Sequence, residues 1–437
     1  MSGIGFERVA AALDGVRISR PAGRIGALSG GRVTVTGLGA HAAIGDLVRL
    51  GDMMGGEIVA APGGPVEVLT DGAQDGLRPG TPVTYEGPAR IAPDDSWLGR
   101  VVDPAGTPLD GRAILPGRNR RSLSGDPPPA GERRALGARL STGVRGFNTL
   151  LPVVQGQRIG LFAGSGVGKT TLLSMLARGI EADVVVVGLV GERGREVREF
   201  CEKVLGPEGM RRTVVIAATS DRPAASRRRC APAAMAVAEH FRDQGRNVLL
   251  LADSVTRHAD AHREVAFARG EGAVHGGYPA SMPADVMGLC ERAGPGAGSS
   301  GDITAIFTVL VPGSDMEGPV ADVLRGVLDG HVVLDREIAE RGRFPAVDLS
   351  RSVSRSLPDA ADERENTLIS EARRLIGAYE RSEMMIRAGL YAQGSDRTVD
   401  SAIAAWPKLD AFIAEVESGA VQDSFIGLAR CLSRRDR

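Results

Sequence analysis

The feature that most constrains this chain is a glycine-rich loop, residues 163–171, which reads Ala-Gly-Ser-Gly-Val-Gly-Lys-Thr-Thr. It follows a strand-like apolar run at 158–162 and leads into a helix-like run at 171–178. Glycines let successive main-chain N–H groups converge on one anion, and the following helix adds its positive N-terminal end. Strand, loop and helix in this order predict a phosphate-binding loop.

The loop predicts ATP as ligand, with Mg²⁺ as the counter-ion of its phosphates. We expect Lys169 to reach the β- and γ-phosphates and the hydroxyl of Thr170 to ligate the metal. The other residues expected to contact the nucleotide are Gly164, Ser165, Gly166, Val167, Gly168 and Thr171. Ala163 stands where the usual pattern has its first glycine, which is a mild departure because alanine is also small.

Composition excludes several classes of protein. The chain has 437 residues, a length typical of two or three domains, and a formal net charge of −1. This balance gives no general attraction to nucleic acid or membrane, and 4 % aromatic residues disfavour base-stacking platforms. No apolar run approaches the ~20 residues of a membrane span. The four cysteines lack metal-ligand spacing, so we expect free thiols in a cytoplasmic protein.

The first 90 residues are expected to form a small β-barrel. Short β-prone runs alternate there with Gly/Pro turn clusters, a spacing typical of small barrels. The predicted strands are 32–36, 46–50, 57–60 and 66–70. An irregular Pro/Gly-rich stretch follows at about 91–135.

Beyond this stretch, short apolar runs alternate with longer helical segments, which indicates a buried, mainly parallel sheet flanked by helices. The predicted strands are 159–162, 184–187, 214–217, 248–251 and 303–310. From residue 359 onward, apolar residues recur at helical spacing over 363–378 and 399–418. We therefore predict an α/β fold. Its three domains are an N-terminal barrel (1–90), a nucleotide-binding domain (91–358) and a C-terminal helical domain (359–437).

Two carboxylates fall where such a sheet binds its ligand. Asp253 ends the apolar run 248–253, and the carboxyl ends of parallel strands border the ligand crevice. There it is expected to hold Mg²⁺ through the metal's water shell, although capping the next helix is an alternative role. Glu192 follows the run 184–190 and is placed to orient or deprotonate the attacking water. The alternative for Glu192 is a charged, solvated loop.

Three further residues are candidates for the same site. Arg193 is expected to hold Glu192 or to touch phosphate. Phe344 offers a ring for stacking on adenine, with ordinary core packing as the alternative. Arg355 is a candidate arginine finger that enters a neighbouring subunit's site and stabilises charge on the transferring phosphoryl group.

Two other patterns are given structural interpretations. His258 and His262 have the i, i+4 spacing of a metal pair on a helix, but no third ligand accompanies them. We expect surface or packing histidines. The basic run 226–229 is expected to be a helix start that faces solvent, with phosphate or subunit contacts as the lesser option.

Taken together, these segments resemble the flagellum-specific members of the type III secretion ATPases, a family similar to the catalytic subunits of rotary ATP synthases. The motifs that carry the resemblance span 99–103, 108–111, 141–145, 156–169, 191–200, 242–245, 253–257, 329–334 and 344–348. The similarity covers nearly the whole chain and is weakest in the first 90 residues. It separates flagellar from virulence-type injectisome members less sharply than it defines the superfamily.

The resemblance implies roles for individual residues. Glu192 matches the family's catalytic carboxylate, where noncatalytic synthase subunits carry Gln, and Arg193 matches the arginine beside it. Asp253 matches the Mg²⁺-site aspartate and Arg355 the intersubunit arginine finger.

The resemblance also implies a base pocket. Phe344 falls where the catalytic synthase subunits place an adenine-stacking tyrosine, and Tyr391 is implied as another wall. The sequence departs from the family pattern at His258, where an aromatic is more usual, and at 316–319, which puts the loop geometry near 312–319 in doubt.

The family's architecture implies a RecA-like core in a homo-hexameric ring at the cytoplasmic face of the membrane export gate. It also implies a stator-like regulator, a central stalk protein and chaperone–substrate complexes as partners, with no nucleic acid. The expected function is Mg²⁺-dependent ATP hydrolysis that energises protein export, flagellar by preference over an injectisome. The alternatives are a noncatalytic nucleotide-binding ring subunit, an RNA-translocating hexamer and rotary ATP synthesis.

Overall fold

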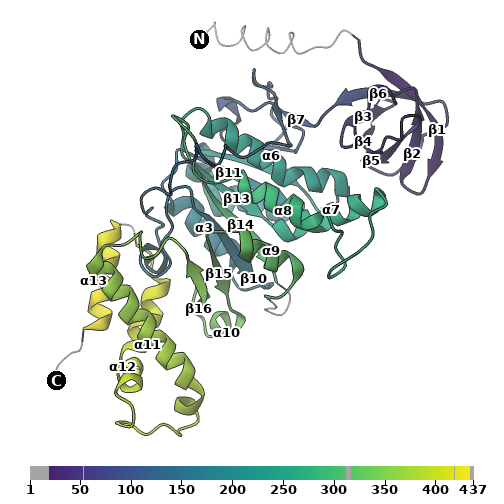
Figure 1. The fold of residues 1–437 in the computed structure, drawn as a ribbon. Coiled ribbons are helices and arrows are strands. Elements are labelled where there is room, and N and C mark those ends of the chain that lie inside the picture. Colours follow the sequence, from purple (N-terminus) through teal and green to yellow (C-terminus); the bar gives the residue numbers. More distant parts are fainter. Residues whose placement is uncertain (1–18, 53, 312–315, 418, 434–437) are drawn as a thin grey trace.

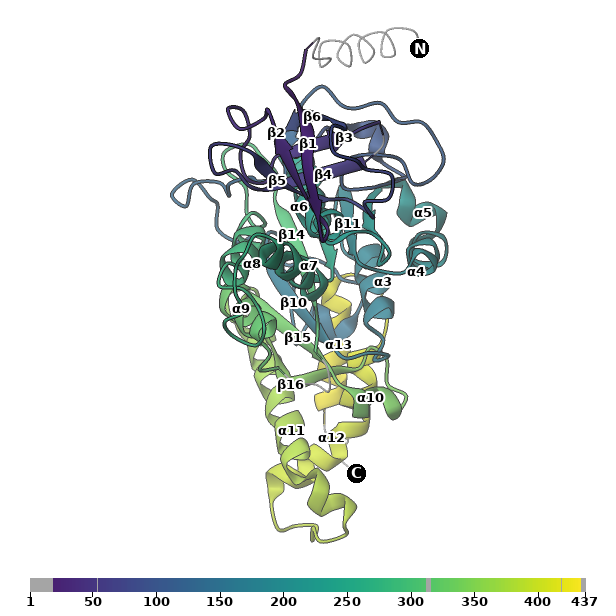
Figure 2. The ribbon, with the colours of Figure 1, turned by 90° about the vertical axis from the view of Figure 1, so that its right-hand side faces the viewer.

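The computed structural model describes residues 19–52, 54–311, 316–417 and 419–433. Along this part of the chain a closed β-barrel, a large mixed sheet with helices on both faces, and a group of long helices follow one another from the N-terminal to the C-terminal end (Figure 1). Figure 2 shows the barrel and the helical hairpin at opposite ends of an elongated molecule.

The barrel closes through six antiparallel strands in the order β1-β2-β5-β4-β3-β6. The strands are β1 (Ala22–Ser29), β2 (Arg32–Thr36), β3 (Leu47–Leu50), β4 (Met54–Ala60), β5 (Val66–Thr70) and β6 (Pro82–Gly87). Alternate residues point inward and form a core of their own, with Val33, Val35, Val66 and Val68 fully buried. This alternation is why the short β-prone runs form a barrel.

The central sheet has eight strands in the order β16-β15-β10-β14-β13-β11-β12-β8. All pair in parallel except β16, which is antiparallel to β15. The strands are β8 (Arg100–Val102), β10 (Arg158–Ala163), β11 (Val184–Val190), β12 (Thr213–Ala218), β13 (Val248–Asp253), β14 (Ile303–Leu310), β15 (Gly330–Leu334) and β16 (Val347–Ser354). A separate short pair joins β7 (Arg90–Ile91) to β9 (Arg121–Ser122).

Helices cover both faces of this sheet (Figures 1 and 2). Those of the nucleotide-binding part are α2 (Arg145–Asn148), α3 (Lys169–Gly179), α4 (Gly194–Glu199), α5 (Gly206–Arg211), α6 (Ala224–Arg242), α7 (Val255–Ala268), α8 (Met282–Glu291), α9 (Pro319–Val327) and α10 (Arg336–Glu340). A 3₁₀ turn (η1, Asp95–Trp97) and a π-helical turn (η2, Phe200–Leu205) complete the set. Val185 and Val187 of β11 pack toward α3, whereas Val184 and Val186 pack toward α6. Both faces are therefore buried, which explains the unbroken valine run.

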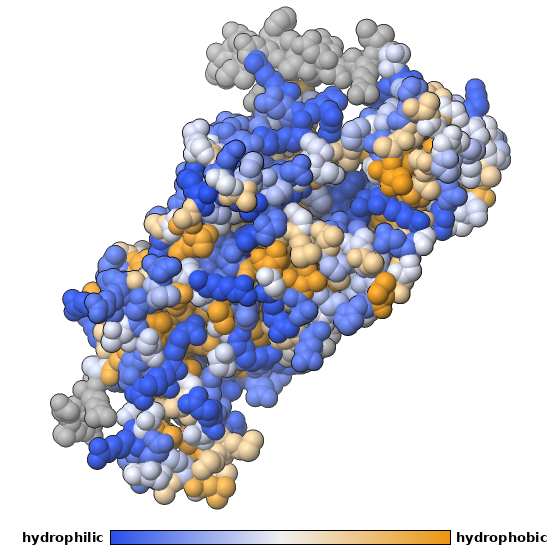
Figure 3. All heavy atoms as spheres, in the orientation of Figure 1, coloured by the Kyte–Doolittle hydropathy of each residue, from blue (hydrophilic) through white to orange (hydrophobic). Residues whose placement is uncertain are grey.

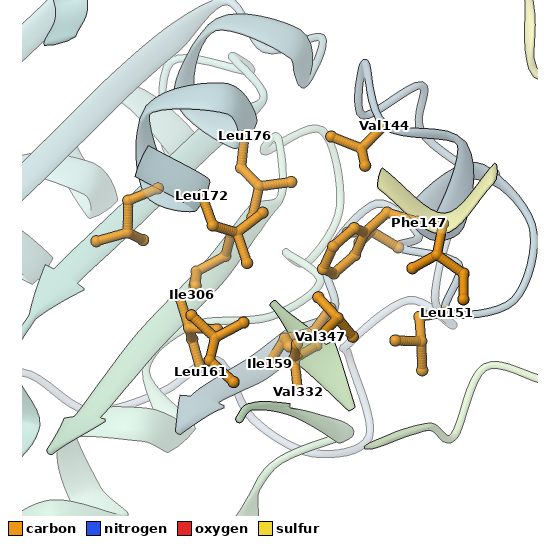
Figure 4. Packing of buried hydrophobic residues seen from close by; sticks show 14 of the residues in the cluster. Val144, Phe147, Leu151, Ile159, Leu161, Leu172, Leu176, Ile306, Val332 and Val347 are labelled. Carbon is orange, nitrogen blue, oxygen red and sulfur yellow. The ribbon is translucent and has the colours of Figure 1, made fainter. Parts of the chain in front are cut away.

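Three helices form the C-terminal part: α11 (Glu363–Arg387), α12 (Arg397–Ala414) and α13 (Val421–Leu432). The connection between α11 and α12 lies at the tip of a hairpin (Figure 2). Their apolar faces join the core beneath α3, part of which Figure 4 shows around Phe147 and Leu172. None of the helices in the described ranges is both long and apolar enough to span a bilayer.

The predicted fold class is confirmed. Several strands were not predicted, because their local sequence pattern is weak. The five strands not predicted from the sequence are β1 and β6 of the barrel, and β8, β15 and β16 of the sheet. These strands are short, glycine-containing or polar on one face, so their local pattern is weak. Residues 1–18 and Ser418, which fall in the predicted barrel domain and a predicted helix, lie outside the described residues. The domain boundaries stay predictions.

Candidate functional site

The phosphate loop connects the buried strand β10 to the N-terminus of α3. Gly166 (φ +79°) and Gly168 (φ +88°) adopt left-handed backbone conformations that favour glycine over any residue with a side chain. Val167 between them is 3 % exposed and anchors the loop in the core. The loop therefore takes its shape from its two left-handed glycines and one buried valine, and α3 begins at Lys169.

Lys169 and Asp253 meet at the carboxyl edge of the sheet. Asp253 is the last residue of β13, and its Oδ1 forms an ion pair with Lys169 Nζ. The same oxygen accepts a hydrogen bond of 2.6 Å from the hydroxyl of Thr308 in the neighbouring strand β14. A buried carboxylate needs such partners, and Asp253 is only 5 % exposed.

Glu192 lies beside this pair at the end of β11. Its Oε1 is 3.8 Å from Lys169 Nζ, and its Oε2 is 3.3 Å from Arg257 Nη1. Burial, a side-chain hydrogen bond with Glu196 and the negative charge of Asp253 together raise the pKa of Glu192 to about 7. The pKa of Glu196 is lowered, mainly by that same hydrogen bond. Glu192 is therefore the carboxyl of this pair whose pKa lies near neutral pH, as a general base requires.

The donor set at this edge fits a hard divalent cation. Asp253 supplies a carboxylate and Thr170, one residue after Lys169, supplies a hydroxyl. Mg²⁺ prefers oxygen ligands and is usually held by one or two protein groups, water and substrate phosphates. No cluster of three or more His, Cys, Asp or Glu side chains suited to a metal occurs in the described ranges. Asp253 and Thr170 are thus the residues of this chain that would contribute oxygen ligands to such a cation.

Arg193 is the N-cap residue immediately before α4, and its side chain is exposed. Its main-chain N–H donates to the Glu196 carboxylate at 3.4 Å, and Glu196 in turn contacts Glu192. From the sequence we expected Arg193 to hold Glu192 or to touch phosphate, and the second role stays a prediction. The guanidinium that lies against Glu192 belongs instead to Arg257, which also donates to the carbonyl oxygen of Gly191.

Phe344 lies beside Gly168, the last glycine of the phosphate loop, and its role in base stacking stays a prediction. A Cβ on Gly168 would stand 3.1 Å from Phe344 Cδ1, so the ring covers the start of α3. The ring is 47 % exposed and hence accessible from one side. Tyr391 is anchored elsewhere, in the connection between α11 and α12, with its hydroxyl oxygen 2.9 Å from Asp400 Oδ1. Its role in a base pocket stays a prediction.

Arg355 lies at the opposite edge of the sheet from the phosphate loop of its own chain. Ser354 pairs with Gly330 at the start of β15, whereas Leu334 at the end of β15 pairs with Ala163, next to the loop. Gly330 and Leu334 are four residues apart along β15, which corresponds to roughly 13 Å. The backbone at Arg355 is therefore far from its own phosphate loop, and the side-chain Nη2 donates to the carbonyl oxygen of Arg325 at 3.1 Å.

The sequence analysis gave no role to three residues that shape the site: Thr308, Arg257 and Glu196. For two of these residues, Thr308 and Arg257, the sequence contained a hint of a role in the site. Thr308 is a polar residue in the apolar run 303–310, which was predicted to be a strand, and Arg257 lies four residues after Asp253. Glu196 gave no such hint, because its contact with Glu192 depends on how the chain turns into α4.

One interpretation was correct and one was wrong. His258 and His262 are buried packing residues, and both contact Asp285, at 2.7 and 3.3 Å. The basic run 226–229 does not face solvent. Its last two arginines, Arg228 and Arg229, form ion pairs with the barrel, because α6 begins directly beneath it.

Comparison with known proteins gives matches along nearly the whole chain. The profile of the ATP synthase alpha/beta family, nucleotide-binding domain, matches residues 143–354. That of the T3SS EscN ATPase C-terminal domain matches residues 361–421. These two regions contain the site and the helical hairpin.

Individual relatives agree with the profiles. The flagellum-specific ATP synthase of Caulobacter vibrioides is 44 % identical, over 94 % of this chain and 95 % of its own. The SPI-2 type 3 secretion system ATPase of Salmonella typhimurium is 45 % identical, over 73 % of each chain. The assembled ATPase EscN of the enteropathogenic E. coli type III secretion system superposes with a TM-score of 0.87 at 37 % identity, over 94 % of this chain and all of its own.

Proposed function

The chain belongs to the ATP synthase alpha/beta family, within its type III protein-export ATPases, and on this premise we propose that it hydrolyses Mg²⁺-ATP at the Lys169–Asp253–Glu192 cluster to drive flagellar export. ATP hydrolysis and type III export follow from the family. The flagellar assignment follows from relatives such as those of Caulobacter vibrioides and Agrobacterium fabrum, both named flagellum-specific. The assignment of residues to steps is the proposal.

One observation carries the proposal: Lys169, at the end of the phosphate loop, lies between two buried carboxylates, Asp253 and Glu192. Asp253 is ion-paired and tied to Thr308, whereas Glu192 has a pKa of about 7. In the proposed scheme the loop amides and Lys169 hold the phosphates, and Glu192 orients the attacking water and takes its proton. Thr170 and Asp253 would hold Mg²⁺, which neutralises charge on the phosphates.

The first test replaces the proposed base. Glu192→Gln keeps the shape of the side chain but cannot accept a proton, so we expect turnover to fall at least ~100-fold while ATP binding stays within about twofold. The native enzyme should show kcat/KM rising with pH through an apparent pKa near 7, because Glu192 must be ionised to act. Phosphate release and binding of a fluorescent ATP analogue measure the two effects. Native turnover by Glu192→Gln would refute the assignment.

The second test asks whether the site is shared between subunits. The relative EscN has been determined as an assembled ATPase and in complex with its central stalk EscO. We propose that this chain likewise forms a ring, with a stalk partner, at the cytoplasmic side of the export gate. Because Arg355 lies far from its own phosphate loop, it would serve the loop of a neighbour.

Mixing two inactive variants makes this test decisive. Lys169→Ala removes phosphate binding but keeps Arg355, and Arg355→Ala keeps the loop but removes the finger. If Arg355 acts across an interface, mixed rings regain activity, up to about a quarter of the native rate at equal amounts, since half of all sites retain Lys169 and half of those face an Arg355. Mixtures as inactive as the separate variants would place the action of Arg355 within its own subunit.

A further inference from the structure

Thr308 occupies a special position in the sheet. It lies in β14, between β10, which leads into the phosphate loop, and β13, which ends at Asp253. Its side chain is fully buried, and its hydroxyl donates to Asp253 Oδ1 at 2.6 Å. Its neighbours along the strand, Phe307 and Val309, are apolar core residues on the opposite face.

We propose that Thr308 is a positioning residue that fixes the orientation of the Asp253 carboxylate for the metal bound with the nucleotide. This inference rests on the proposed function of the site. Thr308 touches neither nucleotide nor metal in this scheme and acts through Asp253 alone.

The hydrogen-bond pattern of Asp253 supports this role. Oδ1 accepts from both Lys169 Nζ and Thr308 Oγ1, whereas Oδ2 accepts no side-chain hydrogen bond within the described ranges. A carboxylate held by one oxygen cannot rotate freely, so the other oxygen has a defined direction. Oδ2 is therefore the atom available to a water ligand of the metal.

The hydrogen bond from Thr308 is most important for orienting Asp253 when Lys169 binds the phosphates of the nucleotide. An ammonium that binds the β- and γ-phosphates shares its donors with them and holds Asp253 less tightly. The Thr308 hydroxyl has no competing acceptor of that kind, and at 0 % exposure no solvent replaces it. A neutral, buried donor thus keeps the carboxylate oriented through the whole cycle, and a hydrogen bond to a charged group is among the stronger ones.

The strand supplies a matched control. Thr304, four residues earlier in β14, is also buried, at 4 %, and its hydroxyl oxygen accepts a hydrogen bond of 2.9 Å from the main-chain N–H of Gly156. It lies at the far end of the strand from Asp253. Thr304→Val and Thr308→Val therefore make the same chemical change in the same strand, but only the second one affects Asp253.

The experiment measures binding of a nonhydrolysable ATP analogue to the full chain by calorimetry, with Mg²⁺ and with EDTA. We expect Thr308→Val to weaken binding about tenfold with Mg²⁺ and less than twofold with EDTA. Thr308→Ser, which restores the donor, should recover most of the loss. Thr304→Val should bind like the native protein under both conditions. Melting temperatures of the two valine variants control for a general loss of stability.

Two outcomes would overturn the inference: an unchanged ratio of Mg²⁺ to EDTA affinity in Thr308→Val, or the same shift in Thr304→Val. Lys169→Ala separates this failure from failure of the proposed function. If Lys169→Ala loses analogue binding while Thr308→Val keeps its Mg²⁺ dependence, only the role of Thr308 is refuted. If Lys169→Ala binds normally, the phosphate-site assignment fails first.

Discussion

The nucleotide-binding part of the molecule is joined to its two neighbours in opposite ways. Toward the barrel the contact is ionic, and toward the C-terminal helices it is a continuous hydrophobic core. The barrel and the tip of the helical hairpin lie at opposite ends of the molecule, and the central sheet lies between the two joints (Figure 2).

The barrel joint is built around Glu57 of β4. This carboxylate is 1 % exposed and pairs with Arg228 of α6 and with Arg269 just beyond α7, the latter at 2.7 Å. Asp71 pairs with Arg229 at 2.9 Å. The barrel core consists of barrel residues alone, and a cleft of about 840 Å³ borders the joint. Figure 3 shows hydrophilic side chains gathered where the barrel meets the rest of the molecule.

The helical joint has the opposite character. Phe412 of α12 and Phe425 of α13 belong to the same buried cluster as Phe147 of α2 and Leu172 of α3. At Gly146 a Cβ would stand 2.9 Å from the carbonyl oxygen of Ile413, so the two backbones approach too closely for any side chain there. Movement of the helices must therefore involve the core beneath the phosphate loop, whereas the barrel can shift by exchanging ion pairs.

The substitution with the largest expected effect is one in the helical joint. Phe412→Ala should lower the free energy of unfolding by about 3–5 kcal/mol, because it leaves a cavity in a core that two parts of the chain share. Unfolding in urea can be followed by fluorescence in two single-tryptophan variants, one that keeps Trp97 in η1 and one that keeps Trp406 in α12. Because the two parts share a core, both variants should unfold in the same transition. Two separate transitions would show that the helical part folds independently.

A smaller effect is expected at the barrel joint. Glu57→Gln removes the negative charge that Arg228 and Arg269 share. We expect the free energy of docking the barrel to fall by about 2–3 kcal/mol. The loss is smaller than for a fully buried ion pair, because both arginines are partly exposed. Hydrogen exchange should increase in β3 and β4 and remain unchanged in β10 and α3. Glu67→Gln, which breaks an exposed pair with Arg32 inside the barrel, is the control and should cost less than ~1 kcal/mol. Equal effects of the two variants would contradict an ionic joint.

The smallest expected effect concerns how the stability of the C-terminal helices depends on pH. Glu380 of α11 has a raised pKa, first because of burial and then because of the nearby Asp348. Arg343, whose Nε is 3.1 Å from Asp410 of α12, and Glu383 also face it. A carboxyl whose pKa is raised in the folded state destabilises that state as pH rises from its ordinary value through the raised one.

We therefore expect Glu380→Gln to melt like the native protein near pH 4 and at a higher temperature at pH 8, with a gain below ~1 kcal/mol. Calorimetry across this range measures the difference. A gain that is equal at both pH values would mean that the charge of Glu380 is not its cause.

Much of the site was predictable because its signals are local. The phosphate loop, the strand that ends at Asp253 and the position of Glu192 after a valine run all follow from residues close in sequence. Arg257 and Thr308 were less accessible, because their partners lie 65 and 55 positions away. Arg228 and Arg229 were assigned to solvent because nothing in their own segment shows that a barrel carboxylate lies above them.

By itself, the amino-acid sequence determined the phosphate loop, the buried strands and the order of barrel, sheet and helices, because these depend on glycine conformation and on apolar periodicity along short stretches. Only the tertiary structure decided which charges meet. It buried Glu192 beside Asp253 and Glu196, which raises the pKa of Glu192, placed Arg355 far from its own loop, and made one joint ionic and the other apolar. Electrostatic energies depend on distance and burial in space, and neither is written in the spacing of residues along the chain.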